Sequence, residues 1–176
     1  MRRPYDVRTL VRMPVSDRPG PPGWFDDRRL PWTWAERQIE RARNYWVATA
    51  SAAGQVHTRP VWGVWIDGSL YLSVGGARMA ANLRSAQALS HSERANVTVH
   101  LESGDRVVIL EGSAQLVPTP APREFYETYN AKYEWDYTPE FPGDIVAFRP
   151  ARAYGWISDV DDRGESFQNS ATRWTF

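Results

Sequence analysis

The chain has 176 residues, which is enough for one domain with a real hydrophobic core and too few for two ordinary domains. Its 21 lysines and arginines balance 21 aspartates and glutamates, so bulk charge predicts no binding to nucleic acid or to an anionic membrane surface. The absence of cysteine excludes disulfides, thiolate nucleophiles, iron–sulfur clusters and cysteine zinc sites.

Residues 1–30 are rich in proline and arginine and show no periodicity, which predicts an irregular arm that wraps the surface or a neighbouring chain. Residues 31–176 then form the folded domain. The arm lacks the continuous apolar run of a signal peptide, and no later segment approaches the length of a membrane span. We therefore expect a soluble cytoplasmic protein with no membrane partner.

A first helix is predicted after the arm. Thr33 followed by Glu36 fits a capping box, and apolar residues recur at helical spacing as far as about Arg43. Two strands are predicted next, over 45–51 and 55–66, with a turn at Ala53 and Gly54 between them. Pro60 lies within the second of these, where it predicts a gap in the ladder or a bulge.

Hairpins connect most of the remaining strands. Asp67 and Gly68 form a strong two-residue hairpin signal between 55–66 and a strand over 69–74. Further elements are expected in the order helix 77–90, strand 94–103, strand 106–117, helix 121–135, a strand over 144–157 interrupted by Pro150, and a closing segment 165–176. Six strands connected in this way favour a mainly β fold, a closed or partly closed antiparallel barrel, over a parallel doubly wound sheet. No GxGxxG fingerprint follows a strand either.

The strand over 55–66 carries the first group of candidate cofactor-binding residues. Side chains two apart on a strand share a face, so His57 and Arg59 lie together and Thr58 and Pro60 point the other way. Apolar and aromatic walls with backbone hydrogen bonds suit a flavin or deazaflavin ring. The candidates here are His57, Thr58, Arg59, Pro60, Val61 and Trp62. The alternative is a solvated outer face for His57 and Arg59 and core packing for Trp62.

The second group lies where the next strand gives way to a helix. Ser73 offers a hydroxyl, the Gly75–Gly76 turn offers backbone N–H groups, and Arg78 offers a guanidinium, which together fit a phosphate group. Asn82 follows four residues after Arg78 and shares its helical face. A double-glycine turn before a helix also occurs without any ligand.

The C-terminal sequence ATRWTF is the third candidate element. Arg173 and Trp174 could cover a groove on a partner subunit, with the indole stacking on a ring and the guanidinium meeting an anion. An edge strand that completes the barrel explains the same residues equally well. Tyr133 and Trp135 line that interface or anchor their own helix.

Other chemistries lack support in the sequence. There is no GxSxG elbow and no HExxH motif, and the three histidines have no metal-ligand spacing. The acidic run near Asp161 lacks the ligand pattern of a Ca²⁺ loop. We therefore expect no metal site, and we assign no catalytic residue.

The order of these elements resembles the pyridoxamine 5′-phosphate oxidase superfamily of split β-barrels. The segments YWVATASAAGQVHTRPVWGVWIDG, LYLSVGGARMAANL and VTVHLESGDRVVILEGSAQLV, the helix ending AKYEW and the terminal ATRWTF carry the resemblance, from Tyr45 to Phe176. Within the superfamily they look like the actinobacterial deazaflavin-dependent reductases of the B type. The resemblance implies a six-stranded FMN-binding split barrel, a homodimer with two cofactor grooves at its interface, and FMN or coenzyme F-420 as the cofactor.

What the resemblance implies for function is an oxidoreductase that binds F-420, or FMN, and transfers hydride to a small organic acceptor. Alternatives are an FMN-dependent enzyme like pyridoxamine-phosphate oxidase and a non-catalytic protein that binds or carries F-420, flavin or haem. The related reductases usually have Arg-Lys before Ala-x-Asn-Leu, and here Met79 takes the place of that lysine. One cation fewer weakens anion binding by about 1 to 2 kcal/mol.

Overall fold

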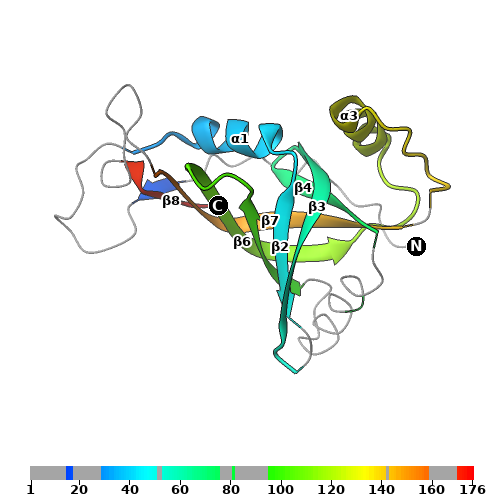
Figure 1. The fold of residues 1–176 in the computed structure, drawn as a ribbon, viewed down its shortest axis with the longest axis horizontal. Coiled ribbons are helices and arrows are strands. Elements are labelled where there is room, and N and C mark those ends of the chain that lie inside the picture. The colour runs from blue at the N-terminus through cyan, green and yellow to red at the C-terminus, as the bar shows by residue number, and fades with distance from the viewer. Residues whose placement is uncertain are drawn as a thin grey trace.

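The structure, a computed structural model, describes residues 15–17, 29–50, 53–75, 81, 95–141, 143–158 and 170–176. Eight strands and two helices have defined bounds within these residues (Figure 1). In chain order they are β1 (Val15–Asp17), α1 (Trp32–Arg41), β2 (Tyr45–Ala50), β3 (Val56–Ile66), β4 (Ser69–Val74), β5 (Ala95–Leu101), β6 (Arg106–Leu116), α3 (Arg123–Tyr133), β7 (Asp144–Ile157) and β8 (Thr172–Thr175). The helix expected over 77–90 lies outside the described residues, apart from one helical residue, Ala81.

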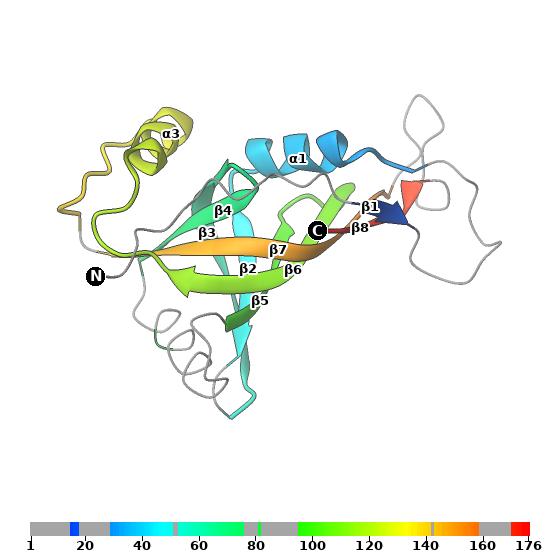
Figure 2. The same ribbon diagram turned by 180° about the vertical axis from the view of Figure 1, so that it is seen from behind.

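Six of the strands close into an antiparallel barrel. The order is β7-β4-β3-β2-β5-β6, and the pairing of β6 with β7 completes the circle. The long strand β7 pairs with β4 through its first half and with β8 through its second half. The short strand β1 pairs with β8 outside the barrel, so three residues of the N-terminal arm are regular (Figure 2). The predicted six-stranded antiparallel split barrel is confirmed.

The predicted capping box at the start of α1 is wrong. The helix begins at Trp32 with Pro31 as its N-cap, and Thr33 lies inside the first turn. Proline has no backbone N–H, so Pro31 leaves no donor unpaired at the start of the helix. Its φ of −68° also suits a residue that leads into a helix. The side chain of Trp32, the first residue of the helix, is buried.

The two strand prolines behave differently. Pairing between β2 and β3 runs through Trp46 and Pro60 without any shift, so the bulge predicted at Pro60 is wrong. Strand β4 pairs with β3 only from Trp62 onward, which leaves Pro60 at an edge where its missing N–H disrupts no ladder.

A bulge does occur beside Pro150. The partners change from Glu111–Arg152 to Gly112–Pro150, so Ala151 is skipped. Gly112 fits this close approach because a Cβ there would collide with the backbone of the opposite strand.

The core consists of two apolar clusters. One fills the barrel, where α1 contributes Ala35 and Ile39, both wholly buried. The other lies between α3 and the outer face of β3, β4 and β7, where Phe125, Tyr129 and Tyr133 recur every four residues along one face of the helix. Alternation along β2, buried then partly exposed, separates barrel interior from outer surface. Helix α3 therefore sits beside the barrel and faces the end of β4.

Candidate functional site

A groove with a volume of about 510 Å³ runs along the outer edge of β3 and the C-terminal end of β4. The antiparallel register places Trp62 opposite Ser73, which brings together residues from two separate predicted groups. The groove is lined by Asn44, Arg59, Pro60, Val61, Trp62, Ser73, Val74, Gly75 and Tyr129. Six of the predicted cofactor-binding residues lie here, namely Arg59, Pro60, Val61, Trp62, Ser73 and Gly75.

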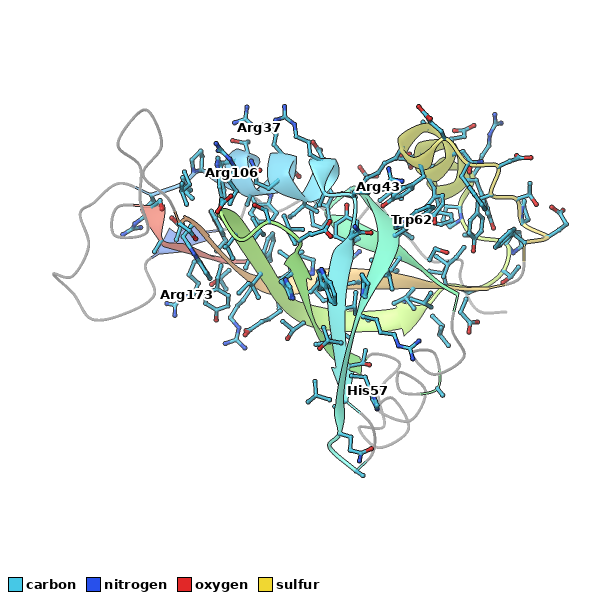
Figure 3. The ribbon with its side chains drawn as sticks, in the orientation of Figure 1. Arg37, Arg43, His57, Trp62, Arg106 and Arg173 are labelled. Atoms are coloured by element: carbon cyan, nitrogen blue, oxygen red, sulfur yellow. The ribbon has the colours of Figure 1, made fainter. Side chains whose placement is uncertain are left out.

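Other predicted residues do not line this groove. His57 lies opposite Thr49 near the start of β3, and Figure 3 shows it at the far tip of the strand from Trp62. Thr58 is exposed on the same part of the strand. Three predicted cofactor-binding residues after the Gly75–Gly76 turn lie outside the described residues: Arg78, Met79 and Asn82.

The C-terminal candidates are also distant from the groove within one chain. Trp174 is wholly buried in the barrel core, where its ring meets Trp32 edge-on with centroids 5.6 Å apart. The prediction that Trp174 stacks on a ligand is therefore wrong. The alternative is correct only in that Trp174 lies on a strand, because β8 pairs with both β7 and β1 and the six-stranded barrel closes without it. Arg173 is on the same short strand, and Figure 3 shows it on the opposite side of the molecule from Trp62.

A stack of side chains holds the aromatic wall of the groove. The ring of Trp62 lies parallel to that of Tyr133, with centroids 4.6 Å apart and an interplanar angle of 5°. The guanidinium of Arg43 lies 5.4 Å from the Trp62 ring centre, and Trp135 meets Trp62 edge-on. Figure 3 shows Arg43 and Trp62 side by side next to α3. Tyr133 and Trp135 thus anchor the wall from α3 and the residues after it.

Tyr133 is fixed by hydrogen bonds beneath this stack. The backbone N–H of Gly63 donates to the Tyr133 hydroxyl at 2.9 Å, and that hydroxyl lies 2.9 Å from the carbonyl oxygens of both Gly63 and Arg43. Burial raises the pKa of Tyr133 to about 12, although its contact with Gly63 lowers it. The hydroxyl therefore stays protonated and keeps the ring in register with β3.

Lys132 adds a partly buried amine to the same network. Its Nζ donates to the Tyr45 hydroxyl at 2.7 Å and to the Gly63 carbonyl at 3.1 Å. The Tyr45 hydroxyl in turn donates to the Ile39 carbonyl at 2.7 Å. Burial lowers the pKa of Lys132 to about 8, against the opposing effect of the Glu40 carboxylate, and burial raises the pKa of Tyr45.

At the β4 end of the groove the polar groups are hydroxyls. Tyr129 shares a side-chain hydrogen bond with Ser73, and burial raises the pKa of Tyr129 more than this bond lowers it. Gly75 is exposed, and a Cβ there would meet nothing within 4 Å. The groove therefore combines a flat aromatic wall, the cation of Arg59, and a hydroxyl end beside an open glycine. That combination suits a planar ring that carries an anion.

Sequence reasoning missed Asn44, Val74, Tyr129 and Lys132. The four-residue spacing of aromatic residues in EFYETYNAKY marks the buried face of α3, but it gives no sign of which strands that face meets. A second hollow of about 490 Å³ lies between β2, β5, β6 and β7 and holds none of the predicted residues. In the described part of the chain no cluster of three or more metal-ligating side chains occurs, and no helix has the length and apolarity needed to span a membrane.

Comparisons with known proteins identify the fold. No family model and no curated protein matches the chain. Among solved structures, a protein from Clostridium acetobutylicum related to general stress protein 26, of the pyridoxinephosphate oxidase family, matches with 13% identity and a TM-score of 0.52, over 70% of this chain and 86% of that one. An F420 reductase matches with 23% identity and a TM-score of 0.50, over 67% and 94%.

The haem storage protein HutZ from Vibrio cholerae matches with 15% identity and a TM-score of 0.53, over 69% of this chain and 90% of that one. One of these proteins is an F420 reductase and another a haem storage protein, so the likeness identifies the fold alone. The chain has the split β-barrel fold of the pyridoxamine 5′-phosphate oxidase-like proteins, as its sequence resemblance implied.

Proposed function

We propose that this chain is an oxidoreductase that binds F-420, or FMN, in the groove along β3 and β4 and passes hydride to a small organic acceptor. The observation that supports this most is the convergence of Arg59, Trp62, Ser73 and Gly75 on one groove. The F420 reductase with the same fold gives further support.

Some groove residues would contact the ring of the cofactor, and others would bind its phosphate. Val61 and Trp62 offer apolar contact for a flat ring, and the stack on Tyr133 holds the Trp62 indole in place before a ligand arrives, which limits the entropy lost on binding. Arg59 and the backbone at Gly75 would hold the phosphate. The bound cofactor would supply the hydride chemistry, while the protein orients the ring and keeps water from its covered face.

We also propose that two copies form a homodimer and that the groove is completed at their interface. On the outer face of the barrel Trp46 and His100 stack in parallel, 6.2 Å apart, and Val56 is 68% exposed. Partly exposed aromatic rings and an exposed apolar side chain such as Val56 are typical of protein interfaces. Sedimentation of the purified protein tests this proposal, and a species with the mass of one chain at micromolar concentration would contradict it.

Titration with F-420, FMN and haem distinguishes the possible cofactors. Bound FMN gives a yellow sample and bound haem gives a Soret band, while F-420 binding raises the fluorescence polarisation of the ligand. Among the groove-lining residues that the structure describes there is no histidine to ligate haem iron, which favours a flavin or deazaflavin. Binding without hydride transfer to any acceptor would support the alternative of a carrier protein.

Replacing Arg59 by alanine is expected to weaken binding of FMN or F-420 about tenfold, because a charge-assisted contact with phosphate is lost. The matched control is Arg37→Ala, since Arg37 lies on α1 away from the groove (Figure 3) and bonds only to the Thr33 carbonyl of its own helix among the contacts described. Fluorescence titration of both variants measures the effect. Equal affinities in the two variants would remove Arg59 from the site.

A further inference from the structure

The hydroxyl of Tyr137 is buried without a hydrogen-bond partner in the described structure. The residue is 4% exposed, and its backbone is fixed by Asn130, whose side chain donates to the Tyr137 carbonyl at 3.0 Å and accepts from its N–H at 2.7 Å. A buried hydroxyl without a partner costs folding free energy, and most buried polar groups in proteins avoid that cost. Among the described residues the hydroxyl has no partner, so its hydrogen is free to be donated to a bound group.

This hydroxyl is buried near the glycine end of the groove, although Tyr137 is not part of the groove lining. A Cβ built on Gly143 would be 3.6 Å from the Tyr137 hydroxyl oxygen and 4.0 Å from the Cα of Gly75. Gly75 lines the groove and has open space where a side chain would be. The unpartnered hydroxyl and Gly75 therefore both border the position where a side chain of Gly143 would be.

Two further hydroxyls extend the cluster into the groove. The Tyr129 ring lies 5.1 Å from that of Tyr137, and Tyr129 bonds to Ser73 on β4. Tyr129 and Ser73 both line the groove. A hydroxyl has two acceptor lone pairs and one donor hydrogen, so the Tyr129–Ser73 pair keeps one hydrogen available for a ligand.

We infer that the hydroxyls of Ser73, Tyr129 and Tyr137 form a donor cluster beside Gly75 that binds the phosphate of the cofactor. This inference rests on the proposed function. A phosphate oxygen accepts several hydrogen bonds at once, and neutral phenols donate to it without the desolvation cost of a second buried cation. Donors of this kind would also give the Tyr137 hydroxyl, which is unpaired among the described residues, an acceptor when the cofactor is bound.

The test compares FMN with riboflavin, which has the same ring and no phosphate. Tyr137→Phe is expected to weaken FMN binding about fivefold to tenfold and to leave riboflavin binding unchanged. The same variant is expected to have a higher melting temperature than the wild type without ligand, because the unsatisfied hydroxyl is gone, and a smaller rise in melting temperature on adding FMN. F-420 and its phosphate-free chromophore form a parallel pair of ligands.

Tyr126→Phe is the matched control. Tyr126 lies on α3 against the same aromatic cluster, but its hydroxyl already accepts a hydrogen bond from the Ala121 N–H at 3.1 Å. Its loss should lower the melting temperature and leave the preference for FMN over riboflavin unchanged. Equal effects of Tyr137→Phe on FMN and riboflavin, or no effect on either, would overturn the donor cluster while leaving the proposed function intact. A wild-type protein that binds neither FMN nor F-420 would overturn both.

Discussion

Replacing Trp174 by alanine is expected to lower the free energy of unfolding by about 3 to 5 kcal/mol, the range for removing a large aromatic side chain from a core. Trp174 is the largest of the fully buried side chains and packs on Trp32. A Cβ on Gly155 would lie 2.9 Å from its ring, so the ring fills the space against β7 with little room to spare. Loss of the indole would leave a cavity where β8 joins the barrel.

Denaturant unfolding of the two proteins measures this effect, with Trp135→Ala as the control. Trp135 is 49% exposed, and its removal should change the unfolding free energy by less than half as much. Trp174→Phe, which keeps most of the volume, should bind the cofactor as the wild type does. If Trp174→Phe instead lost cofactor binding at unchanged stability, the C-terminal indole would belong to the site after all.

Most strands of the barrel could be predicted from the sequence, because the patterns that indicate strands and hairpins involve residues close together in the chain. The hairpin at Asp67 and Gly68, for example, forms with positive φ at both residues, 46° and 72°. Once that hairpin sets the register, Trp62 and Ser73 must lie opposite one another. Much of the groove could therefore be predicted from the hairpin turn and from the two-residue repeat of side chains along a strand.

The remainder depends on contacts between distant parts of the chain. The bond from Lys132 to Tyr45 joins residues 87 positions apart, and no local pattern indicates it. Trp62 and Trp174 are also alike as sequence features, since each is a tryptophan within a strand. Which one enters the core depends on the strand that covers it, and single-sequence periodicity does not contain that information.

The network around Lys132 predicts an unusual dependence of stability on pH. The amine has a pKa of about 8 in the folded chain, below its ordinary value of 10.5, so between these values the unfolded chain binds more protons. Stability therefore rises as the pH increases from 8 to 10. Above pH 10 the direction reverses, because unfolded tyrosines lose protons that Tyr45 and Tyr133 retain in the folded state.

The expected rise from pH 8 to pH 10 is on the order of 1 to 2 kcal/mol, less than the full pKa difference would give, because the half-buried amine is partly screened by water. Lys132 is the only lysine in the chain, so the Cε resonance in a carbon-13 NMR titration reports its pKa without overlap. Urea unfolding at several pH values measures the stability. Lys132→Met keeps the length of the side chain and removes the titrating group, so it should abolish the rise while keeping the decline above pH 10. A rise that persists in Lys132→Met, or a lysine that titrates near 10.5, would show that the amine is hydrated and that Tyr133 is held in place without it.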